Sequence, residues 1–213
     1  MLNVWEKETI PEEWTEAVII PLHKKGDKQV CSNYRDLEIQ CKLANANKSL
    51  GACTKILSSK LLSRCTKLRL YKTIIQPVLL YGSETWVLSK RNEGRLVIFE
   101  RKVLRKIFGP VCEDGVWRIR KNRELRALYQ EPDIIALIKA KRISWLGHVL
   151  RREEGTRLKE VCKAVPAGRR PLGRPKLRWL DQVGRDVVRC GGTIGMAEDR
   201  EEWRRLVYEA KID

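Results

Sequence analysis

The stretch from Leu68 to Gly109 constrains the fold most strongly, because apolar residues recur in it at helical spacing between clear stop signals. Pro77 predicts a kink in the first helix of this stretch, or the end of its first part, since proline has no backbone N–H to donate. Gly82 is expected to mark the C-terminal stop of that helix. The apolar positions of this first helix are Leu68, Tyr71, Ile74, Ile75, Val78 and Leu79.

A second helix is expected after Ser89, whose side-chain oxygen can accept hydrogen bonds from the free amides of a first turn. Gly109 and Pro110 predict its end. Its apolar stripe consists of Leu96, Phe99, Val103 and Ile107. Six cations lie off the stripe and are offset only by Glu93 and Glu100. These candidate nucleic-acid-binding residues are Arg91, Arg95, Arg101, Lys102, Arg105 and Lys106.

This second helix can therefore bury one face and offer the other face to phosphate groups. A charged helix face is most often simply solvated, and that alternative stays open. Six cations against two carboxylates do not form a salt-bridged surface of balanced sign, so the sequence favours an anionic partner.

Two phrases in this stretch, TKLRLYKTIIQPVLLYGSETWVLSKR and FERKVLRKIFGP, resemble the thumb region of reverse transcriptases from animal non-LTR (LINE-like) retrotransposons. Near the N-terminus, IPEEWTEAVIIPLHKKGDKQVCSNYR is similar to the opening of the fingers in the same family. The resemblance implies a nucleotide-binding remnant at Lys24, Lys25 and Arg35, facing the phosphates of an incoming nucleotide. The alternative for these residues is a surface hairpin with ordinary charges, built on a short edge strand at Ala17–His23.

The same resemblance implies that the palm is missing. Family members follow their Asn-Tyr-Arg motif with Pro-Ile and the palm, whereas this chain joins a fingers-like segment to a thumb-like helix near Asp36–Leu37. Polymerases need carboxylates that converge on two Mg²⁺ ions, and the family supplies them from the palm, partly as an Asp-Asp pair. The sequence contains no Asp-Asp pair. We therefore expect no catalytic residue, no metal site, no cofactor and no polymerase activity in this chain alone, although intact family members use Mg²⁺.

A second concentration of cations spans Arg157–Arg178, where eight Lys and Arg residues accompany one carboxylate, Glu160. Its centre, AGRRPLGRPKLRW, is rich in Gly and Pro and predicts an exposed loop. GRPK resembles a minor-groove hook for A·T-rich DNA, but Leu172 stands where the hook has arginine. General phosphate binding is therefore the stronger hypothesis, and a basic linker between helices is the alternative. The candidate residues of this loop are Arg169, Arg170, Arg174, Lys176 and Arg178. GRRPLGRPKLRWLDQV and DREEWRRLVYEAK also resemble the C-terminal extension of the retrotransposon family.

The rest of the chain is expected to be mostly helical. One helix is predicted over residues 37–62 and another over Ala197–Lys211. Ser63 and Asn122 are each expected to cap a helix that follows them. Two further helices are expected, one with Pro132 in its first turn and one that starts at Pro175. Gly115 predicts a turn in a small hairpin or loop. His148 is expected to be partly buried with a backbone partner, and most tryptophans to be core anchors. Trp117 and Trp179 are flanked by arginines and are the two candidates for another role.

The net charge of +17 and a pI near 9.8 favour nucleic acid or an acidic membrane surface as partner. An acidic membrane surface is the weaker alternative, because no helix clearly pairs its basic face with exposed bulky residues. No apolar run approaches the ~20 residues that span a bilayer. Seven scattered cysteines without a C-x-x-C pair argue against a disulfide scaffold, and only two histidines argue against a zinc site. With no evident signal peptide, we expect an intracellular protein, cytoplasmic or nuclear.

The sequence therefore predicts a mainly α protein, a helical array with a short N-terminal β element. Its expected parts are a fingers-like fragment (1–36), a thumb-like helical region (37–109) and a basic helical extension (110–213). The expected function is non-specific binding of RNA or DNA by a catalytically inactive, palm-deleted relative of reverse transcriptases. Two alternatives stay open: an inert structural remnant, and an accessory fragment that acts when a full-length retrotransposon reverse transcriptase supplies the palm.

Overall fold

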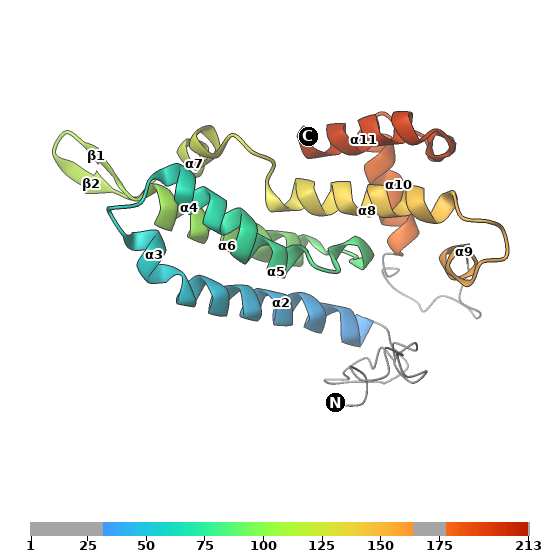
Figure 1. Ribbon diagram of the computed structural model, residues 1–213, viewed down its shortest axis with the longest axis horizontal. Helices are drawn as coiled ribbons and strands as arrows, with labels where there is room; N and C mark the ends of the chain where they lie inside the picture. The colour runs from blue at the N-terminus through green and yellow to red at the C-terminus, as the bar shows by residue number, and fades with distance from the viewer. Residues whose placement is uncertain (1–31, 164–177, 213) are drawn as a thin grey trace, which may run out of the picture. The chain divides into compact units, whose positions relative to one another are not determined.

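The computed structural model describes residues 32–163 and 178–212 and confirms a mainly α fold (Figure 1). The expected edge strand at Ala17–His23 and the helix start at Pro175 lie outside the described residues. From Glu38 onward the chain forms one compact unit. The elements of the described ranges are α2 (Ser32–Ala52), α3 (Thr54–Ser58), α4 (Arg64–Leu70), the π-helical turn η2 (Tyr71–Ile75), α5 (Gln76–Leu80), the 3₁₀ turn η3 (Ser83–Thr85), α6 (Lys90–Phe108), β1 (Val111–Glu113), β2 (Val116–Arg118), α7 (Asn122–Tyr129), α8 (Ile134–Leu150), α9 (Arg157–Lys163), α10 (Trp179–Arg189), the 3₁₀ turn η4 (Ile194–Glu198) and α11 (Arg200–Ile212).

Helix α2 begins at Ser32, so it includes the Asn-Tyr-Arg motif that the sequence predicts to precede the helix. The segment expected as one helix over 37–62 is divided, since α2 ends at Ala52 and the short α3 follows. Ser63 caps α4 as predicted, by accepting a hydrogen bond from the N–H of Thr66 at 3.1 Å. The expected apolar positions are buried, namely Ile39, Ala46, Leu50, Cys53 and Leu57, with Leu43 packed partly buried against them.

The helix that contains Pro77 continues through the proline, because a π-helical turn precedes it. Elements α4, η2 and α5 follow one another without a break, and the N–H of Gln76 donates to the carbonyl of Tyr71, five residues back. This wider turn accommodates a proline, which has no N–H and whose ring crowds the preceding turn. The helix ends at Leu80 instead, and Gly82 follows with φ +76°, as predicted for the stop.

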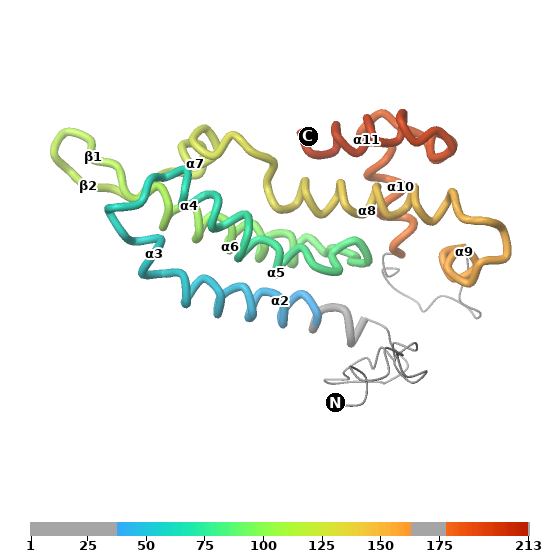
Figure 2. The backbone as a smooth tube through the Cα atoms, in the orientation of Figure 1, coloured from blue at the N-terminus to red at the C-terminus, as the bar shows by residue number. Residues whose placement is uncertain are grey.

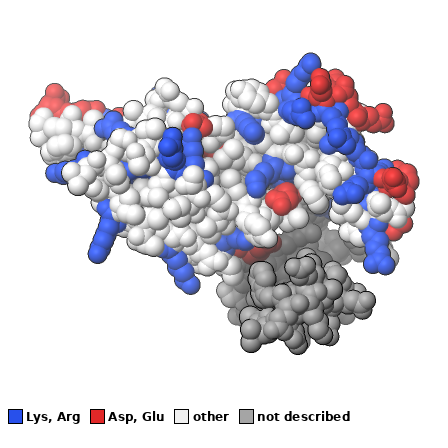
Figure 3. All heavy atoms as spheres, in the orientation of Figure 1, with Lys and Arg blue, Asp and Glu red and all other residues white. Residues whose placement is uncertain are grey.

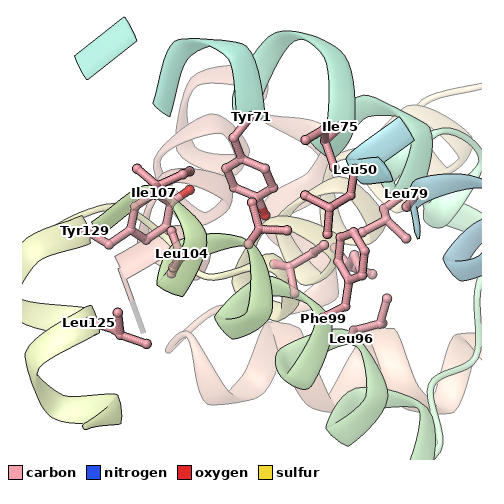
Figure 4. Close-up of a cluster of buried hydrophobic side chains, with 14 of the residues drawn as sticks. Leu50, Tyr71, Ile75, Leu79, Leu96, Phe99, Leu104, Ile107, Leu125 and Tyr129 are labelled. Atoms are coloured by element: carbon pink, nitrogen blue, oxygen red, sulfur yellow. The ribbon is translucent and has the colours of Figure 1, made fainter. Parts of the chain in front are cut away.

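The larger hydrophobic cluster is formed by α2, α3, the η2–α5 segment, α6, α7 and the start of α8, and Figure 4 shows side chains of these helices facing one another. Ser89 caps α6 as predicted, accepting from the N–H of Asn92 at 3.3 Å. Ile74 was expected inside but is 47% exposed, because the π turn rotates it away from the buried side. The predicted stripe of α6 is buried throughout: Leu96, Phe99, Val103 and Ile107.

Glu100 of α6 is a carboxyl inside this cluster and is 3% exposed. Its Oε1 accepts a hydrogen bond from the Tyr71 hydroxyl at 3.2 Å, and its Oε2 accepts one from the N–H of Ile134, the first residue of α8, at 3.2 Å. Burial raises the pKa of Glu100 to about 7, although the hydrogen bond from Ile134 acts in the opposite direction. Glu100 therefore ties α6 both to η2 and to the N-terminus of α8.

We expect Glu100→Gln to reduce a pH dependence of stability in the neutral range. In the wild type, the folded-state pKa of about 7 lies above the ordinary value of 4.5, so the folded state holds this proton more tightly. The stabilising contribution of the group is complete below the ordinary pKa and is lost as the pH rises through 7, a change of up to about 3 kcal/mol. Urea denaturation at about pH 5 and about pH 8 measures this change. If the free energy of unfolding fell equally between the two pH values in the wild type and in Glu100→Gln, Glu100 would not be the source of the pH dependence.

A hairpin follows α6, with the predicted turn at Gly115. Strands β1 and β2 pair antiparallel, and Asp114 and Gly115 both have positive φ in the turn between them. Arg118 donates hydrogen bonds to the carboxylates of Glu113 and Glu124, and the bond to Glu124 lowers the pKa of that carboxyl to about 2. The adjacent acidic residues of the hairpin therefore serve an ion pair and a turn.

Two predicted helix starts are displaced. Asn122 is the first residue of α7 and not its cap, and the Glu124 side chain instead accepts from the N–H of the residue before the helix at 2.9 Å. Pro132 precedes α8, which is capped by Asp133; its carboxylate accepts from the second and third helical N–H groups at 3.0 and 2.9 Å. Leu128 was expected inside but is 38% exposed, because α7 buries only two residues four apart.

A smaller hydrophobic cluster joins α8, α10, η4 and α11, and Figure 2 shows α8 and α11 running side by side. Trp203 of α11 lies against Gly147 of α8, and its ring N–H donates to the carbonyl of Ile143 at 2.9 Å. A Cβ on Gly147 would lie 2.1 Å from Nε1 of Trp203, so this approach of α8 and α11 requires glycine. The expected apolar positions are buried at Val183, Val187, Trp203, Leu206 and Ala210, and partly buried at Leu180 and Val207.

We expect Gly147→Ala to lower the free energy of unfolding by about 3 kcal/mol, because the Trp203 ring and the α8 backbone must separate. Gly94→Ala on α6 is the matched control, since both glycines are helical but nothing lies within 4 Å of a Cβ added at Gly94. Alanine favours a helix over glycine by about 1 kcal/mol, so the control should be neutral or stabilising. Urea titrations of both variants test this, and similar losses in the two would contradict the packing argument.

Arg142 of α8 is 1% exposed and joins the two clusters through a polar network. Its Nη2 donates to Asp186 of α10 at 2.5 Å, and its Nη1 donates to Oε1 of Gln182 at 2.8 Å and to the carbonyl of Trp86 at 3.3 Å. Gln182 also accepts from the N–H of Leu88 and donates to its carbonyl, at 2.9 and 2.8 Å. Burial lowers the pKa of Arg142, and the Asp186 carboxylate opposes that effect. The network holds α10 and the segment before α6 together on α8.

The two hydrophobic clusters divide inside α8, with Ile138 in the first cluster and Ala140 in the second. Residues on both sides of Gly109 belong to the first cluster. The division of the chain into segments 1–36, 37–109 and 110–213 stays a prediction from the family resemblance.

Candidate nucleic-acid interface

The six predicted cations of α6 occupy one side of this helix. Each residue of an α-helix is rotated by about 100° around the helix axis from the one before it. On this basis four of the six cations lie within about 60° of one another around the axis, namely Arg91, Arg95, Lys102 and Lys106. Arg101 and Arg105 widen the arc to about 140°. The buried stripe lies opposite this arc, so the basic face and the core share one helix whose ends are fixed by Ser89 and Gly109.

Three of the six cations are held by neutral oxygen atoms on neighbouring helices. The pairs are Lys102 Nζ to Asn47 Oδ1 at 2.9 Å, Lys106 Nζ to Thr54 Oγ1 at 3.0 Å, and Arg105 Nη2 to Asn122 Oδ1 at 2.8 Å. The first two acceptors belong to α2 and α3, and the third belongs to α7, so these helices border the basic face on two sides. Neutral acceptors position the cations without cancelling their charge.

The positive charge of this face is left almost uncompensated. Among the side chains that the structure describes, none of the six cations forms an ion pair with a carboxylate. Glu100 is turned into the core, where its raised pKa leaves it partly protonated near neutral pH, and Glu93 is half-buried. Ile98, near the centre of the face, is 66% exposed. The face therefore differs from a solvated surface of balanced sign and can attract phosphate groups.

The remaining predicted site residues are not brought together by the described part of the chain. Arg178 is the residue before α10 and is half-buried. Arg35 lies on α2, and its side chain is outside the described set. Also outside are Lys24, Lys25, Arg169, Arg170, Arg174 and Lys176. Among the predicted site residues, only the six cations of α6 thus lie together on one described surface.

Sequence reasoning missed the cations that border the α6 face. Lys48 and Lys55 are exposed beside the two acceptors on α2 and α3, and Arg123 is exposed beside the acceptor on α7. Their placement depends on which helices pack next to α6. No local pattern in the sequence carries that information.

The environment predicted for His148 is wrong. The side chain is exposed, its ring stacks on Trp145 with centroids 5.3 Å apart, and its Nε2 accepts from Nη2 of Arg152 at 3.2 Å. Trp145 lies three positions earlier on the same side of α8, and Arg152 lies just after the end of the helix, so both partners are side chains. Trp117 is 69% exposed on the hairpin and is no core anchor, whereas Trp179 is half-buried and donates its ring N–H to a carbonyl of η3 at 2.8 Å.

Within residues 32–163 and 178–212, no group of three or more His, Cys, Asp or Glu residues could hold a metal ion. None of the helices in these ranges is long and apolar enough to cross a bilayer. Free thiols are present at Cys41, Cys53, Cys65, Cys112 and Cys162. The candidate interface is therefore built from cations and neutral hydrogen-bonding groups.

The chain is similar to a transposon-derived protein of Caenorhabditis elegans whose function is uncharacterized. The two are 26% identical over 149 residues, which cover 66% of this chain and 53% of the relative. The similarity supports a transposon origin. The chain spans about half the length of that relative. No family model matches the chain, and no solved structure matches it.

Proposed function

We propose that the chain is a transposon-derived, reverse-transcriptase-like protein without a palm, which binds RNA or DNA through phosphate groups. The observation that carries this proposal is the α6 face, with six cations within about 140° of helix surface and no carboxylate ion pair among the described side chains. The similarity to a transposon-derived protein and the thumb-like resemblance of this stretch agree with a nucleic-acid ligand.

The manner in which the cations are held favours phosphate binding. Each phosphate that a cation neutralises releases condensed counterions, which drives association at low salt. Lys102, Arg105 and Lys106 are already positioned by neutral oxygen atoms, so binding costs them less side-chain entropy. The one amide side chain of α6, Asn92, is buried, and the amides of Asn47 and Asn122 beside the face already accept from Lys102 and Arg105, so the face offers few groups that pair with adenine edges. Sequence preference should therefore be slight.

The segment Arg169–Arg178 is a second binding surface in this proposal, on the basis of its sequence alone. We also propose that the chain is no polymerase by itself, because the family's palm carboxylates have no counterpart in the sequence. An accessory role beside a full-length reverse transcriptase is the second candidate, and the thumb-like resemblance of the α6 region favours it.

We expect the triple variant Arg91→Gln, Arg95→Gln and Lys102→Gln to bind nucleic acid more weakly and with less salt dependence. About five phosphate contacts give a log–log slope of roughly −4 to −5 on duplex DNA, and loss of three contacts should flatten it by about 2.7. The matched control is Arg185→Gln, Arg189→Gln and Arg205→Gln, which removes the same charge from exposed positions of α10 and α11. Fluorescence anisotropy from about 50 to 200 mM salt measures both slopes.

Equal slopes for the two triple variants would show that net charge, and not the α6 face, determines binding. If the wild type binds neither duplex nor single strand at about 50 mM salt, the inert-remnant alternative applies instead. Unchanged circular dichroism spectra of the variants provide the folding control.

We expect the purified chain to incorporate no nucleotide into a primed RNA or DNA template with Mg²⁺ or Mn²⁺, because no carboxylate set is encoded to hold the two metal ions. Primer extension on a sequencing gel measures this, with an active reverse transcriptase as the positive control. Incorporation that co-purifies with the chain in independent preparations would overturn the proposal.

A further inference from the structure

A groove of about 740 Å³ lies between the C-terminal half of α8 and the start of α11. The groove is separate from the α6 face. Each of its lining side chains has another lining residue three or four positions away in the sequence. Figure 3 shows Lys and Arg side chains over α11 and the end of α8, with Asp and Glu side chains interspersed among them. The charged residues and the histidine that line the groove are Arg151, Arg152, Arg200, Arg204, Glu153 and His148.

Two of these arginines are positioned by neutral acceptors. Nη1 of Arg151 donates to the carbonyl of Ala197 at 2.8 Å, and Nη2 of Arg152 donates to Nε2 of His148 at 3.2 Å. Each guanidinium has five donors, so most of its donors stay available after such a contact. Arg151 and Arg152 are thus pre-oriented at the wall of the groove without losing their charge.

The groove concentrates positive charge without a matching set of carboxylates. Among the described side chains, none of its four arginines forms an ion pair, and Glu153 is the one carboxylate in the lining. Four like charges around one groove repel one another, which is unfavourable unless an anion shares the space. The hydroxyl group of Ser144 adds a neutral donor to the same lining, whereas the hydroxyl group of Thr156 already donates to the carbonyl of Glu153 at 2.9 Å.

We propose that this groove binds consecutive phosphate groups of a nucleic-acid strand, as a second contact site beside the α6 face. The proposal rests on the nucleic-acid-binding function proposed above and names a further site for the same ligand. Guanidinium groups match phosphate oxygens with paired hydrogen bonds, and a groove with four of them can hold more than one phosphate at a time. Its volume lies in the range of sites that enclose nucleotide-sized ligands.

The supporting wall of the groove is rigid, because Trp203 forms part of the lining and is locked against Gly147. The ring N–H of Trp203 is already bonded to a backbone carbonyl, and the residue is 2% exposed. Trp203 therefore shapes the groove and offers no face for a base to stack on. Contacts in the groove should then be to the backbone of the strand, with no preference among bases.

The test compares two double variants. The groove variant carries Arg200→Gln and Arg204→Gln together, and the control variant carries Arg189→Gln and Arg205→Gln together. Both doubles remove two exposed arginines, and Arg204 and Arg205 are neighbours on α11, but only Arg200 and Arg204 line the groove. For a single-stranded oligonucleotide we expect about tenfold weaker binding and a salt slope smaller by about 1.4 in the groove variant. The control should lose at most about twofold.

Equal losses of oligonucleotide affinity in the two double variants would overturn the proposal that the groove binds the strand, and would leave the overall positive charge as the cause of binding. Full binding by the groove variant, with loss in the α6 triple variant, would also overturn the groove and leave the α6 proposal intact. Weaker binding by the groove variant, with full binding by the α6 triple variant, would support the groove as a binding site and contradict the binding role proposed for the α6 face.

Tripolyphosphate is the second probe, and its effect on the thermal unfolding midpoint separates the two possible sources of phosphate. If it stabilises the wild type but not the groove variant while no oligonucleotide binds, free polyphosphate is the ligand, and both the strand assignment and the proposed function fail. If neither probe binds the wild type, no phosphate site exists in the groove. Strand binding that the groove variant loses, with tripolyphosphate as competitor, supports the proposal.

Discussion

The buried guanidinium of Arg142 is the interaction on which the arrangement of the other helices depends. Its three partners come from two separate segments: Asp186 and Gln182 lie on α10, and the backbone carbonyl of Trp86 lies in the segment before α6. A planar group with fixed donor directions tolerates little sliding of the elements that surround it. Apolar side chains such as Val183 would pack acceptably over a range of offsets, whereas loss of one member of a buried ion pair costs about 3–5 kcal/mol. The hydrophobic clusters thus supply the contact area, and Arg142 supplies the register.

This arrangement places the α6 face and the groove between α8 and α11 on helices that also build the core. The α6 helix buries one half of its circumference and presents cations on the other half, so its binding face moves only if the core moves. The groove between α8 and α11 likewise depends on the contact between Gly147 and Trp203, which sets how closely the two helices approach. Proteins that bind through flexible basic tails pay an ordering entropy at each encounter. Surfaces built on packed helices avoid much of that cost.

The sequence was a good guide to most features that depend on neighbours in the chain, although the starts of α7 and α8 are displaced from the predicted positions. The stripe and the Ser89 cap of α6, the stop at Gly82 and the turn at Gly115 all rest on neighbours in the chain, and the structure confirms them. Prediction failed where partners distant in sequence decide. Nothing local distinguishes Arg142 from its neighbours Lys139 and Lys141, or indicates that it would find Asp186 forty-four positions later. The groove was missed for the same reason, since its two walls come from helices whose shared edge is known only once they pack.

The π turn before Pro77 has a consequence for how this chain can change its length. A turn that spans five residues instead of four holds one surplus residue while leaving the buried side chains on both sides aligned, as Tyr71, Ile75 and Leu79 are. Deletion of a residue from an ordinary α-helix rotates everything downstream by about 100° and turns the core side outward. Between Tyr71 and Ile75 a deletion would instead close the wide turn into regular helix, and the exposed Ile74 is the position with least to lose. The segment is therefore a built-in site of tolerance to deletion inside the larger hydrophobic cluster.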